Sequence, residues 1–262
     1  MATIAWVGLL LFSAGMLNTK PSPVFAEVSI GSAGPYRFLV DTGSQTSLID
    51  PALAKRLQLK PEFRVELMTQ NSTRLLPALK MSTLRIGHKH LRDAEVVLDD
   101  LDQARRLDRS VMGVLGINAL ADSDFSLSPR TGKLDINGTR PSGESVPFYR
   151  VEDRIAIRAR MGDEDLTLIL DSAATHMVLF RTPRAMAKTN TIPATFGTFE
   201  GARLTVPTCW TADMEFTRSL KFGTLPAAIV ARQGSRADGL MPASLFKKIY
   251  VDYTHGEVVL IR

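Results

Sequence analysis

The sequence predicts a mostly β protein with a few short helices, organised as two similar lobes. Short apolar runs between turn-forming residues recur along the chain, as is typical of strands. An apolar strand that ends in an aspartate occurs at Asp41 and again at Asp171. Each half then closes with two short segments joined by a turn, at residues 125–136 and 249–261. We therefore expect an internal duplication of about 115–120 residues.

Length and composition are those of an ordinary globular protein. The 262 residues suffice for two domains of about 100–150 residues each. The net charge is +5, but no run of five basic residues occurs, so we expect no nucleic-acid partner. The single cysteine, Cys209, excludes an intrachain disulfide. His88 and His90 would share one face of a strand without a third ligand, so we expect no metal and no cofactor.

The chain begins with an apolar run at residues 4–17, and no charged residue precedes Lys20. At about 14 residues the run is short for a membrane span and typical of the core of a signal peptide. We expect residues 1–20 to be a signal peptide cut near residues 13–15, or an uncleaved membrane anchor. The folded part would then be exported, to the periplasm or the extracellular space.

The first half, expected at residues 21–140, contains the elements that the second half repeats. Alternation and turn residues predict a hairpin, a short helix that starts at a proline, and then further strands. The expected segments are a hairpin of 24–30 with 36–40, a helix at 51–57, strands at 62–68, 73–86 and 94–98, a charged connector at 99–110, a glycine-bearing run with a short helix at 111–120, and a linker at 138–147.

The second half, expected at residues 141–262, replays this order. Strands at 151–161 and 165–170 lead to Asp171, and a hairpin is expected around residues 195–201. Residues 237–246 correspond to the earlier glycine-bearing run. We predict a boundary near residues 138–148 and a pseudo-twofold axis between the halves.

Each aspartate stands where a buried strand enters a turn of small and hydroxyl residues. A carboxylate there is costly to ionise unless hydrogen bonds receive it. Around Asp41, the hydroxyls of Thr42 and Ser44 and the backbone N–H groups of the turn are available. Such carboxylates could serve catalysis, or they could only cap the turns of an inactive protein.

The run Asp41-Thr42-Gly43-Ser44, followed further on by an apolar segment that ends in Gly116, resembles the aspartic protease superfamily. The repeat resembles the pepsin-like, two-lobed arrangement, and the lobes resemble compact retropepsin-like bacterial members. The resemblance covers roughly residues 24–262. It implies an acid-protease-like fold of two β-barrel-like lobes with short helices.

The resemblance also implies roles for individual residues. Asp41 and Asp171 would form the catalytic pair of an aspartic endopeptidase. The residues expected to brace the site are Thr42, Gly43, Ser44, Ser172, Ala173 and Gly116. The residues expected in a flap over the substrate are Thr69, Gln70, Asn71, Ser72 and Thr73, although the tyrosine found in pepsin-like flaps is missing.

The implied chemistry needs two carboxyl groups that share one proton. One takes a proton from a water between them, and the other polarises the carbonyl oxygen of the scissile bond. The substrate would be a peptide or protein, cut by a two-lobed monomer. We also expect Asp41 to be the more readily ionised member, because Gly43 and Ser44 can receive its charge.

The second half departs from the family pattern at Ala173, Ala174 and Pro242. These departures keep open an alternative function, a catalytically inactive acid-protease-like fold that acts as a binding or interaction protein. A further alternative pairs the first lobes of two chains, but the second aspartate turn argues against it. No Gly-x-Ser-x-Gly motif occurs, so serine hydrolysis has no support.

Overall fold

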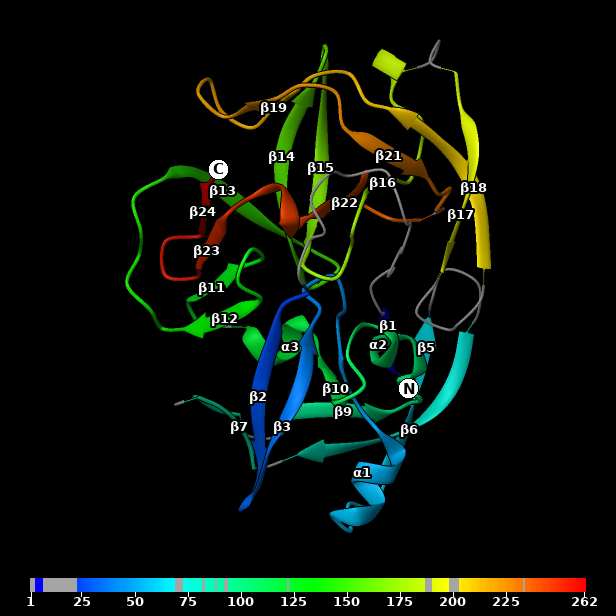
Figure 1. The fold of residues 1–262 in the computed structure, drawn as a ribbon, viewed down its shortest axis with the longest axis vertical. Helices are drawn as coiled ribbons and strands as arrows, with labels where there is room; N and C mark the ends of the chain where they lie inside the picture. The colour runs from blue at the N-terminus through cyan, green and yellow to red at the C-terminus, as the bar shows by residue number, and fades with distance from the viewer. Residues whose placement is uncertain are drawn as a thin grey trace.

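The structure, a computed structural model, describes residues 3–6, 23–68, 73–81, 83–87, 89–91, 94–121, 123–186, 190–197, 203–232 and 234–262. These residues form 24 strands and three short α-helices (Figure 1). The predicted fold class, a mostly β protein with short helices, is confirmed.

The first half holds twelve of these strands and all three of these helices. The strands are β1 (Thr3–Trp6), β2 (Phe25–Ile30), β3 (Ala33–Val40), β4 (Ser47–Ile49), β5 (Phe63–Met68), β6 (Thr73–Met81), β7 (Leu84–Ile86), β8 (Lys89–Leu91), β9 (Ala94–Leu98), β10 (Val111–Leu115), β11 (Phe125–Ser128) and β12 (Lys133–Ile136). The helices are α1 (Pro51–Arg56), α2 (Asp102–Leu107) and α3 (Ile117–Leu120).

The second half holds the other twelve strands and two 3-10 turns. The strands are β13 (Glu144–Val151), β14 (Arg154–Met161), β15 (Glu164–Asp171), β16 (Met177–Leu179), β17 (Ile192–Gly197), β18 (Arg203–Trp210), β19 (Met214–Glu215), β20 (Lys221–Phe222), β21 (Pro226–Ile229), β22 (Gly239–Pro242), β23 (Lys248–Asp252) and β24 (Glu257–Ile261). The 3-10 turns are Arg184–Met186 and Ala243–Leu245.

In the first half, a hairpin delivers the first aspartate. β2 and β3 pair antiparallel, which confirms the predicted hairpin, and β3 leads into Asp41. β10 lies parallel to β3 and antiparallel to β4. The sheet continues from β4 through β9 and β6 to β5. The end of β3 is therefore held between two neighbouring strands.

The second half pairs its strands in the same order. β14 and β15 form the hairpin, and β15 ends at Asp171. β22 lies parallel to β15 and antiparallel to β16. The sheet continues from β16 through β21 and β18 to β17. The internal duplication and its pseudo-twofold axis stay predictions. In these pairings, however, β3 and β15 occupy equivalent positions, and each of them leads into one of the two aspartates.

The two halves meet in a shared set of strands at the left of Figure 1. The hairpins β11–β12 and β23–β24, both predicted from the sequence, pair with each other through β11 and β23. β13 pairs with β24 at its start and with β14 at its end. The chain therefore crosses from one half to the other inside a sheet.

Three local predictions need correction. The charged connector expected at 99–110 contains α2, because Asp102 in its first turn and arginines in its last turn complement the helix dipole. Part of the linker expected at 138–147 belongs to β13, where Val146 is buried against β24. The strand expected at 73–86 is two strands, β6 and β7.

The N-terminal segment is described only at residues 3–6, where β1 pairs in parallel with β5. The rest of the expected signal peptide or anchor lies outside the described residues, so that expectation stays a prediction. Among the residues that are described, no helix is long and apolar enough to cross a membrane.

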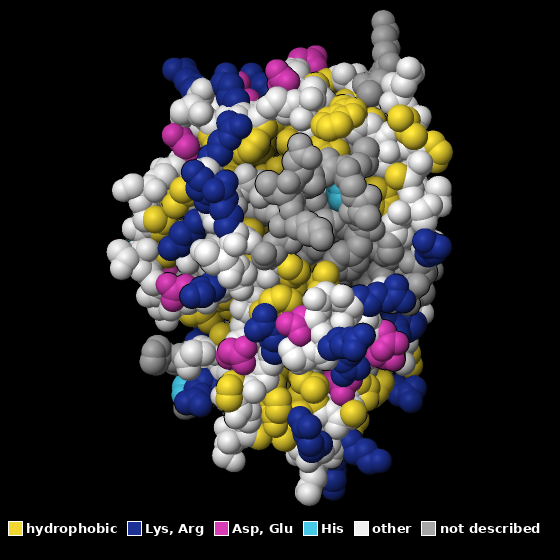
Figure 2. All heavy atoms as spheres, in the orientation of Figure 1, with side chains coloured by type: hydrophobic (Ala, Val, Ile, Leu, Met, Phe, Trp, Pro, Cys, Tyr) yellow, Lys and Arg dark blue, Asp and Glu magenta, His cyan; other side chains and the backbone are white. Residues whose placement is uncertain are grey.

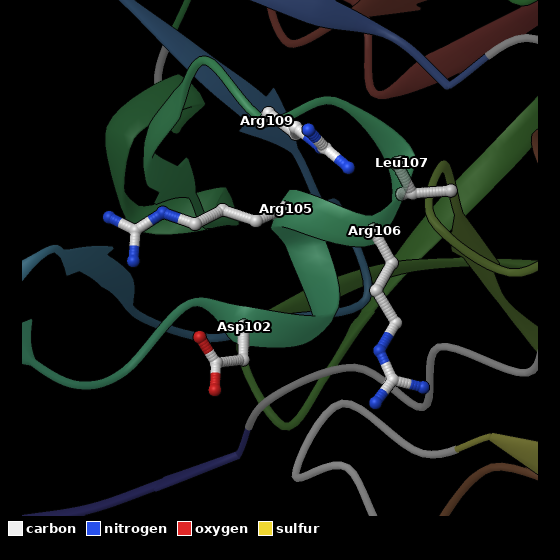
Figure 3. Close-up of a pocket in the computed structure, with 5 residues that line it drawn as sticks. All are labelled: Asp102, Arg105, Arg106, Leu107 and Arg109. Carbon is white, nitrogen blue, oxygen red and sulfur yellow. The ribbon is translucent and has the colours of Figure 1, made fainter.

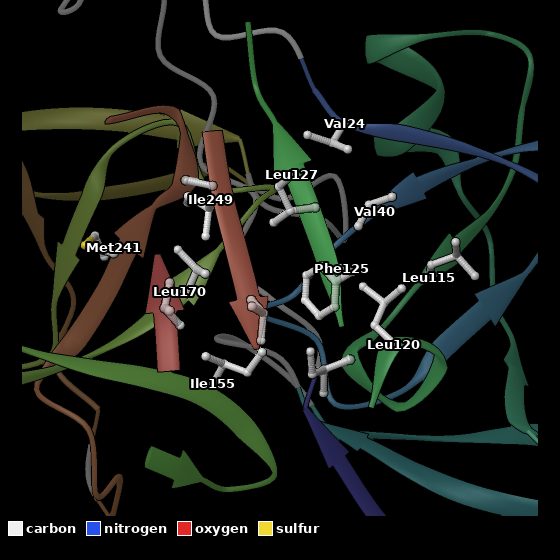
Figure 4. Close-up of a cluster of buried hydrophobic side chains, with 14 of the residues drawn as sticks. Val24, Val40, Leu115, Leu120, Phe125, Leu127, Ile155, Leu170, Met241 and Ile249 are labelled. Carbon is white, nitrogen blue, oxygen red and sulfur yellow. The ribbon is translucent and has the colours of Figure 1, made fainter. Parts of the chain in front are cut away.

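One buried cluster continues through both halves. Figure 4 shows Val40 and Leu115 of the first half in the same cluster as Leu170 and Met241 of the second. A fully buried side chain of this size stabilises a fold by about 1.5–3 kcal/mol. Because Val40 and Leu170 directly precede the two aspartates, this core fixes the strand ends that carry them.

On the surface, basic and acidic side chains are mixed over the lower half of the face in Figure 2, as on an ordinary solvated surface.

Candidate active site

The first aspartate lies where β3 ends. The last three residues of β3 and Asp41 itself are fully buried. The Asp41 N–H donates to Leu115 O at 2.9 Å, so β10 holds the end of the strand. Asp41 Oδ1 accepts hydrogen bonds from the N–H groups of Gly43 (3.0 Å) and Ser44 (3.1 Å). The turn thus supplies the two donors that a buried carboxylate requires.

The second aspartate is held in the same way at the end of β15. Asp171 is fully buried, and its Oδ1 accepts from the N–H groups of Ala173 and Ala174, both at 2.8 Å. Both donors belong to the backbone, so alanine supplies them as well as glycine or serine does. The two alanines therefore do not deprive the Asp171 carboxylate of hydrogen bonds.

Thr42 and Ser172 join the two turns through four hydrogen bonds. Thr42 Oγ1 donates to Leu170 O at 2.8 Å, and Ser172 Oγ donates to Val40 O at 2.7 Å. Each hydroxyl also accepts the N–H of the other residue, at 3.1 Å in both directions. Because each side chain ends on the opposite strand, the two turns are fixed relative to each other.

The structure brings the two carboxylates together on either side of Gly43. A Cβ atom at Gly43 would lie 2.4 Å from Asp171 Oδ2, while the Gly43 N–H binds Asp41 Oδ1. The Oδ2 atoms of Asp41 and Asp171 are buried and have no hydrogen-bond partner among the described residues. These two oxygens are the atoms left to bind a reacting group.

Burial raises the pKa of both carboxyl groups. The pKa of Asp171 is raised to about 6, because burial outweighs the two N–H donors and the charge of Arg154. The pKa of Asp41 is raised well above its ordinary value, first by burial and then by the charge of Asp171. Both pKa values are raised, so the expectation that Asp41 is the more readily ionised member stays a prediction. Groups that interact in this way titrate as a pair and share one proton over a range of pH.

Gly116 lies beneath the Asp41 turn. A Cβ atom there would come within 2.2 Å of Thr46 O, so only glycine fits. The Gly116 N–H donates to Ser47 Oγ at 3.1 Å. Pro242 holds the corresponding place beneath Asp171, opposite it in the pairing of β15 with β22.

The polar pair beneath Asp41 has an apolar counterpart beneath Asp171. Proline has no N–H to donate, and Met177 stands where the first half has the acceptor Ser47. A second departure, Ala173, places its methyl group in a buried cluster that includes Leu39 and Leu48 of the first half. The unusual residues of the second turn are thus accommodated by packing.

Arg154 is a site residue that the sequence patterns did not indicate. It begins β14 and is 1% exposed, and its Nη1 donates to Gly43 O at 3.2 Å. Burial lowers its pKa to about 10, so the guanidinium keeps its charge at neutral pH. The only sign of its burial in the sequence is that it directly precedes the apolar residues 155–157. That pattern does not reveal its contact with the Asp41 turn.

The expected flap is described only in part. Thr73 is exposed at the start of β6 and pairs with Met68 at the end of β5. The other four candidates, Thr69, Gln70, Asn71 and Ser72, lie outside the described residues, so the flap stays a prediction.

In the part of the chain that the structure describes, no group of three or more His, Cys, Asp and Glu side chains could hold a metal ion.

A second polar region, at α2, is distinct from the aspartate pair. Figure 3 shows a pocket lined by Asp102, Arg105, Arg106, Leu107 and Arg109. Arg105 Nη2 lies 2.5 Å from Asp50 Oδ2, and Asp50 caps the start of α1. Arg105 therefore has a structural role, joining two helices.

Comparison with known proteins agrees with the first of the two turns. Residues 26–119 match a family model described as aspartyl protease. The matched range includes Asp41, Thr42, Gly43, Ser44 and Gly116, and it ends before the second half. The match supports assigning the chain to the aspartic protease superfamily. No curated protein matches the chain.

Proposed function

We propose that this chain, assigned to the aspartic protease superfamily through its first half, is an aspartic endopeptidase that uses Asp41 and Asp171 as its catalytic pair. The observation that carries the proposal is two adjacent buried carboxylates, each held through Oδ1 and each with Oδ2 bound by no described residue. Two buried carboxyl groups of raised pKa are costly to a fold and typical of a functional site.

In the proposed reaction, one carboxyl group keeps the shared proton and the other is ionised. The ionised group takes a proton from a water bound between the two Oδ2 atoms, and the oxygen of that water attacks the peptide carbonyl carbon. The protonated group donates to the carbonyl oxygen, where negative charge develops. When the carbon–nitrogen bond breaks, the leaving amine takes up a proton from one carboxyl group, and a hydroxyl of the intermediate returns a proton to the other, so the pair again holds one proton.

The cross-turn hydrogen bonds support this chemistry, because shared-proton catalysis needs the two carboxyl groups at a fixed separation. Thr42 and Ser172 supply that fixation from both sides. A second aspartate turn on the same chain also supports a complete site in one monomer. A peptide or protein is the proposed substrate, and residues 69–73 are the proposed flap over it.

We also propose that the protein is exported, on the basis of the apolar run at residues 4–17. Cell fractionation tests this directly. The expected result is protein in the periplasm, the medium or the membrane fraction. Full-length protein confined to the cytosol would contradict export without bearing on the catalytic proposal.

The competing function is a non-catalytic binding protein on the same fold. Its original support was the set of departures at Ala173, Ala174 and Pro242. The N–H donors to Asp171 and the paired replacement of donor and acceptor near Pro242 weaken that support.

The test is cleavage of a diverse peptide library by the purified protein across a series of pH values. We expect cleavage that peaks on the acid side of neutrality and disappears in Asp41→Asn. Asp135→Asn, which changes an exposed aspartate on β12, is the matched control and should cleave normally. Absence of cleavage at every pH would contradict the proposal and favour the binding protein.

A further inference from the structure

A cluster of charged side chains lies beside the aspartate pair, centred on Glu152 in the turn between β13 and β14. Glu152 Oε2 accepts hydrogen bonds from Arg154 and, at 2.7 Å, from Arg232. Glu152 Oε1 accepts from Ser235 Oγ at 3.0 Å and from the Arg236 N–H at 3.2 Å. The Glu152 carboxylate thus accepts hydrogen bonds from two arginines and from the segment that precedes β22.

Two contacts connect this cluster to the Asp41 turn. Arg154 Nη1 donates to Gly43 O at 3.2 Å, and Gln45 Nε2 donates to Glu152 O at 2.7 Å. Gly43 is also the residue whose N–H holds Asp41 and whose Cα faces the Asp171 carboxylate. The guanidinium is therefore positioned against the turn that separates the two catalytic candidates.

Stability alone does not account for Arg154. Its side chain is 1% exposed, and its Nε has no hydrogen-bond partner among the residues the structure describes. Burial of an arginine is costly, and apolar replacements of buried ion pairs are often as stable as the pair itself. A charge kept at such a place is better explained by its effect on neighbouring groups.

We propose that Arg154 is a positioning residue of the aspartate pair, whose buried charge favours ionisation and so sets the pH range in which the two carboxyl groups share one proton. The inference rests on the proposed function, because it assigns Arg154 to the same site.

The physical basis is the effect of a cation on two buried carboxyl groups. Burial raises the pKa of Asp41 and Asp171, and the charge of Arg154 lowers the pKa of both. Without that charge, the doubly protonated pair, which contains no base, would persist to higher pH. Glu152 opposes Arg154 by neutralising its charge, and Arg232 shares the same carboxylate.

The pair can be titrated without measuring catalysis. Carbon-13 NMR of protein labelled at the aspartate Cγ reports both carboxyl groups, with signals assigned from Asp41→Asn and Asp171→Asn. In Arg154→Met, both apparent pKa values should rise by about one unit or more. The acid limb of peptide cleavage should move to higher pH by the same amount.

Two further variants make the test specific. Arg232→Met removes the other arginine on Glu152 but leaves Arg154 in place, so its shift should be less than half as large. Glu152→Gln keeps one of the two acceptor oxygens, which can still face the arginines, and removes the neutralising charge, so both apparent pKa values should fall.

An unchanged titration in folded Arg154→Met would overturn the inference. If Arg154→Met does not fold, Glu152→Gln decides, because unchanged or raised pKa values there overturn it equally. The titration needs no turnover. A protein that cleaves no peptide but shows these shifts would therefore refute the proposed enzyme while leaving the role of Arg154 in the pair supported.

Discussion

The turns at Asp41 and Asp171 hold their carboxylates in the same way but are built from different residues. In each, one oxygen accepts two backbone N–H groups, and the hydroxyl of the following residue crosses to the opposite strand. The first turn continues with glycine and serine, the second with Ala173 and Ala174. The comparison shows that the backbone N–H donors and the crossing hydroxyls of Thr42 and Ser172 hold the two carboxylates in place. The side chains at positions 173 and 174 can therefore differ from those of the first turn.

The residues beneath the two turns differ more deeply. Under Asp41, the Gly116 N–H donates to Ser47, whereas under Asp171 the corresponding residues are Pro242 and Met177. Replacing both partners of a buried hydrogen bond by apolar groups can be nearly neutral, whereas removing one partner is costly. The second half has exchanged a polar pair for an apolar one and keeps its aspartate in place.

The largest expected contrast in stability is between the residues beneath the turns. Gly116→Ala would place a Cβ atom 2.2 Å from Thr46 O, a backbone atom that cannot move alone. We expect a loss of about 3 kcal/mol or more in the free energy of unfolding. Pro242→Ala, at a φ of −68° that alanine adopts easily, should cost less than about 1 kcal/mol. Urea unfolding measures both, and equal losses would refute the distinction.

The second prediction concerns the cost in stability of the buried Asp171 carboxyl group. A carboxyl group whose pKa rises from 3.8 to about 6 on folding binds its proton more tightly in the native state, so stability falls as pH rises through that interval. Asp171→Asn removes this cost and should stabilise the protein by up to about 3 kcal/mol at neutral pH. The gain should vanish below about pH 4, where Asp171 is protonated in both states. Thermal unfolding across pH tests this, and an Asn variant less stable than the unmodified protein at neutral pH would contradict it.

The third contrast concerns the cross-turn brace. Thr42→Val and Ser172→Ala each remove one crossing hydroxyl and leave a buried carbonyl and N–H unpaired, at an expected cost of about 1–3 kcal/mol. Because the two residues share hydrogen bonds, the double variant should lose less than the sum of the two. Thr42→Ser keeps the hydroxyl and is the control. Strict additivity in urea unfolding would mean that the two hydroxyls act independently.

The smallest expected effect is at position 174. Ser44 Oγ donates to Thr46 O at 2.8 Å, and Ala174→Ser would offer a hydroxyl at the corresponding place in the second turn. Stability should change by less than about 1 kcal/mol, with peptide cleavage unaltered. A large change in cleavage would show that the missing hydroxyl limits the second turn.

Short-range patterns predicted the parts of the fold that depend on neighbouring residues. The hairpins, α1 and the aspartate turns follow from alternation, from Pro51 and from small turn residues. The sequence patterns did not predict α2, because a run of charged residues is typical of an exposed connector as well as of a short helix whose charges suit the helix dipole. The start of β13 was missed because its partner, β24, lies at the far end of the chain.

The sequence likewise indicated only those parts of the candidate site that depend on residue type at neighbouring positions. The sequence marked Asp41, Asp171 and Gly116, because only certain residue types fit such positions. It did not reveal the donors to Asp171, since backbone N–H groups leave no trace in residue type. Arg154 was missed because its contact with the Asp41 turn exists only after both halves have folded.

The central claim is that the divergent second turn supplies a working half of one site. The most direct test is kcat/KM for peptide cleavage by Asp41→Asn, Asp171→Asn and the double variant. Two residues that act as one unit have strongly non-additive effects. Each single variant should therefore lose at least about a thousandfold in kcat/KM, with no further loss in the double variant. Activity in Asp171→Asn close to that of the unmodified protein would contradict the claim, because the reaction would then not require the second turn.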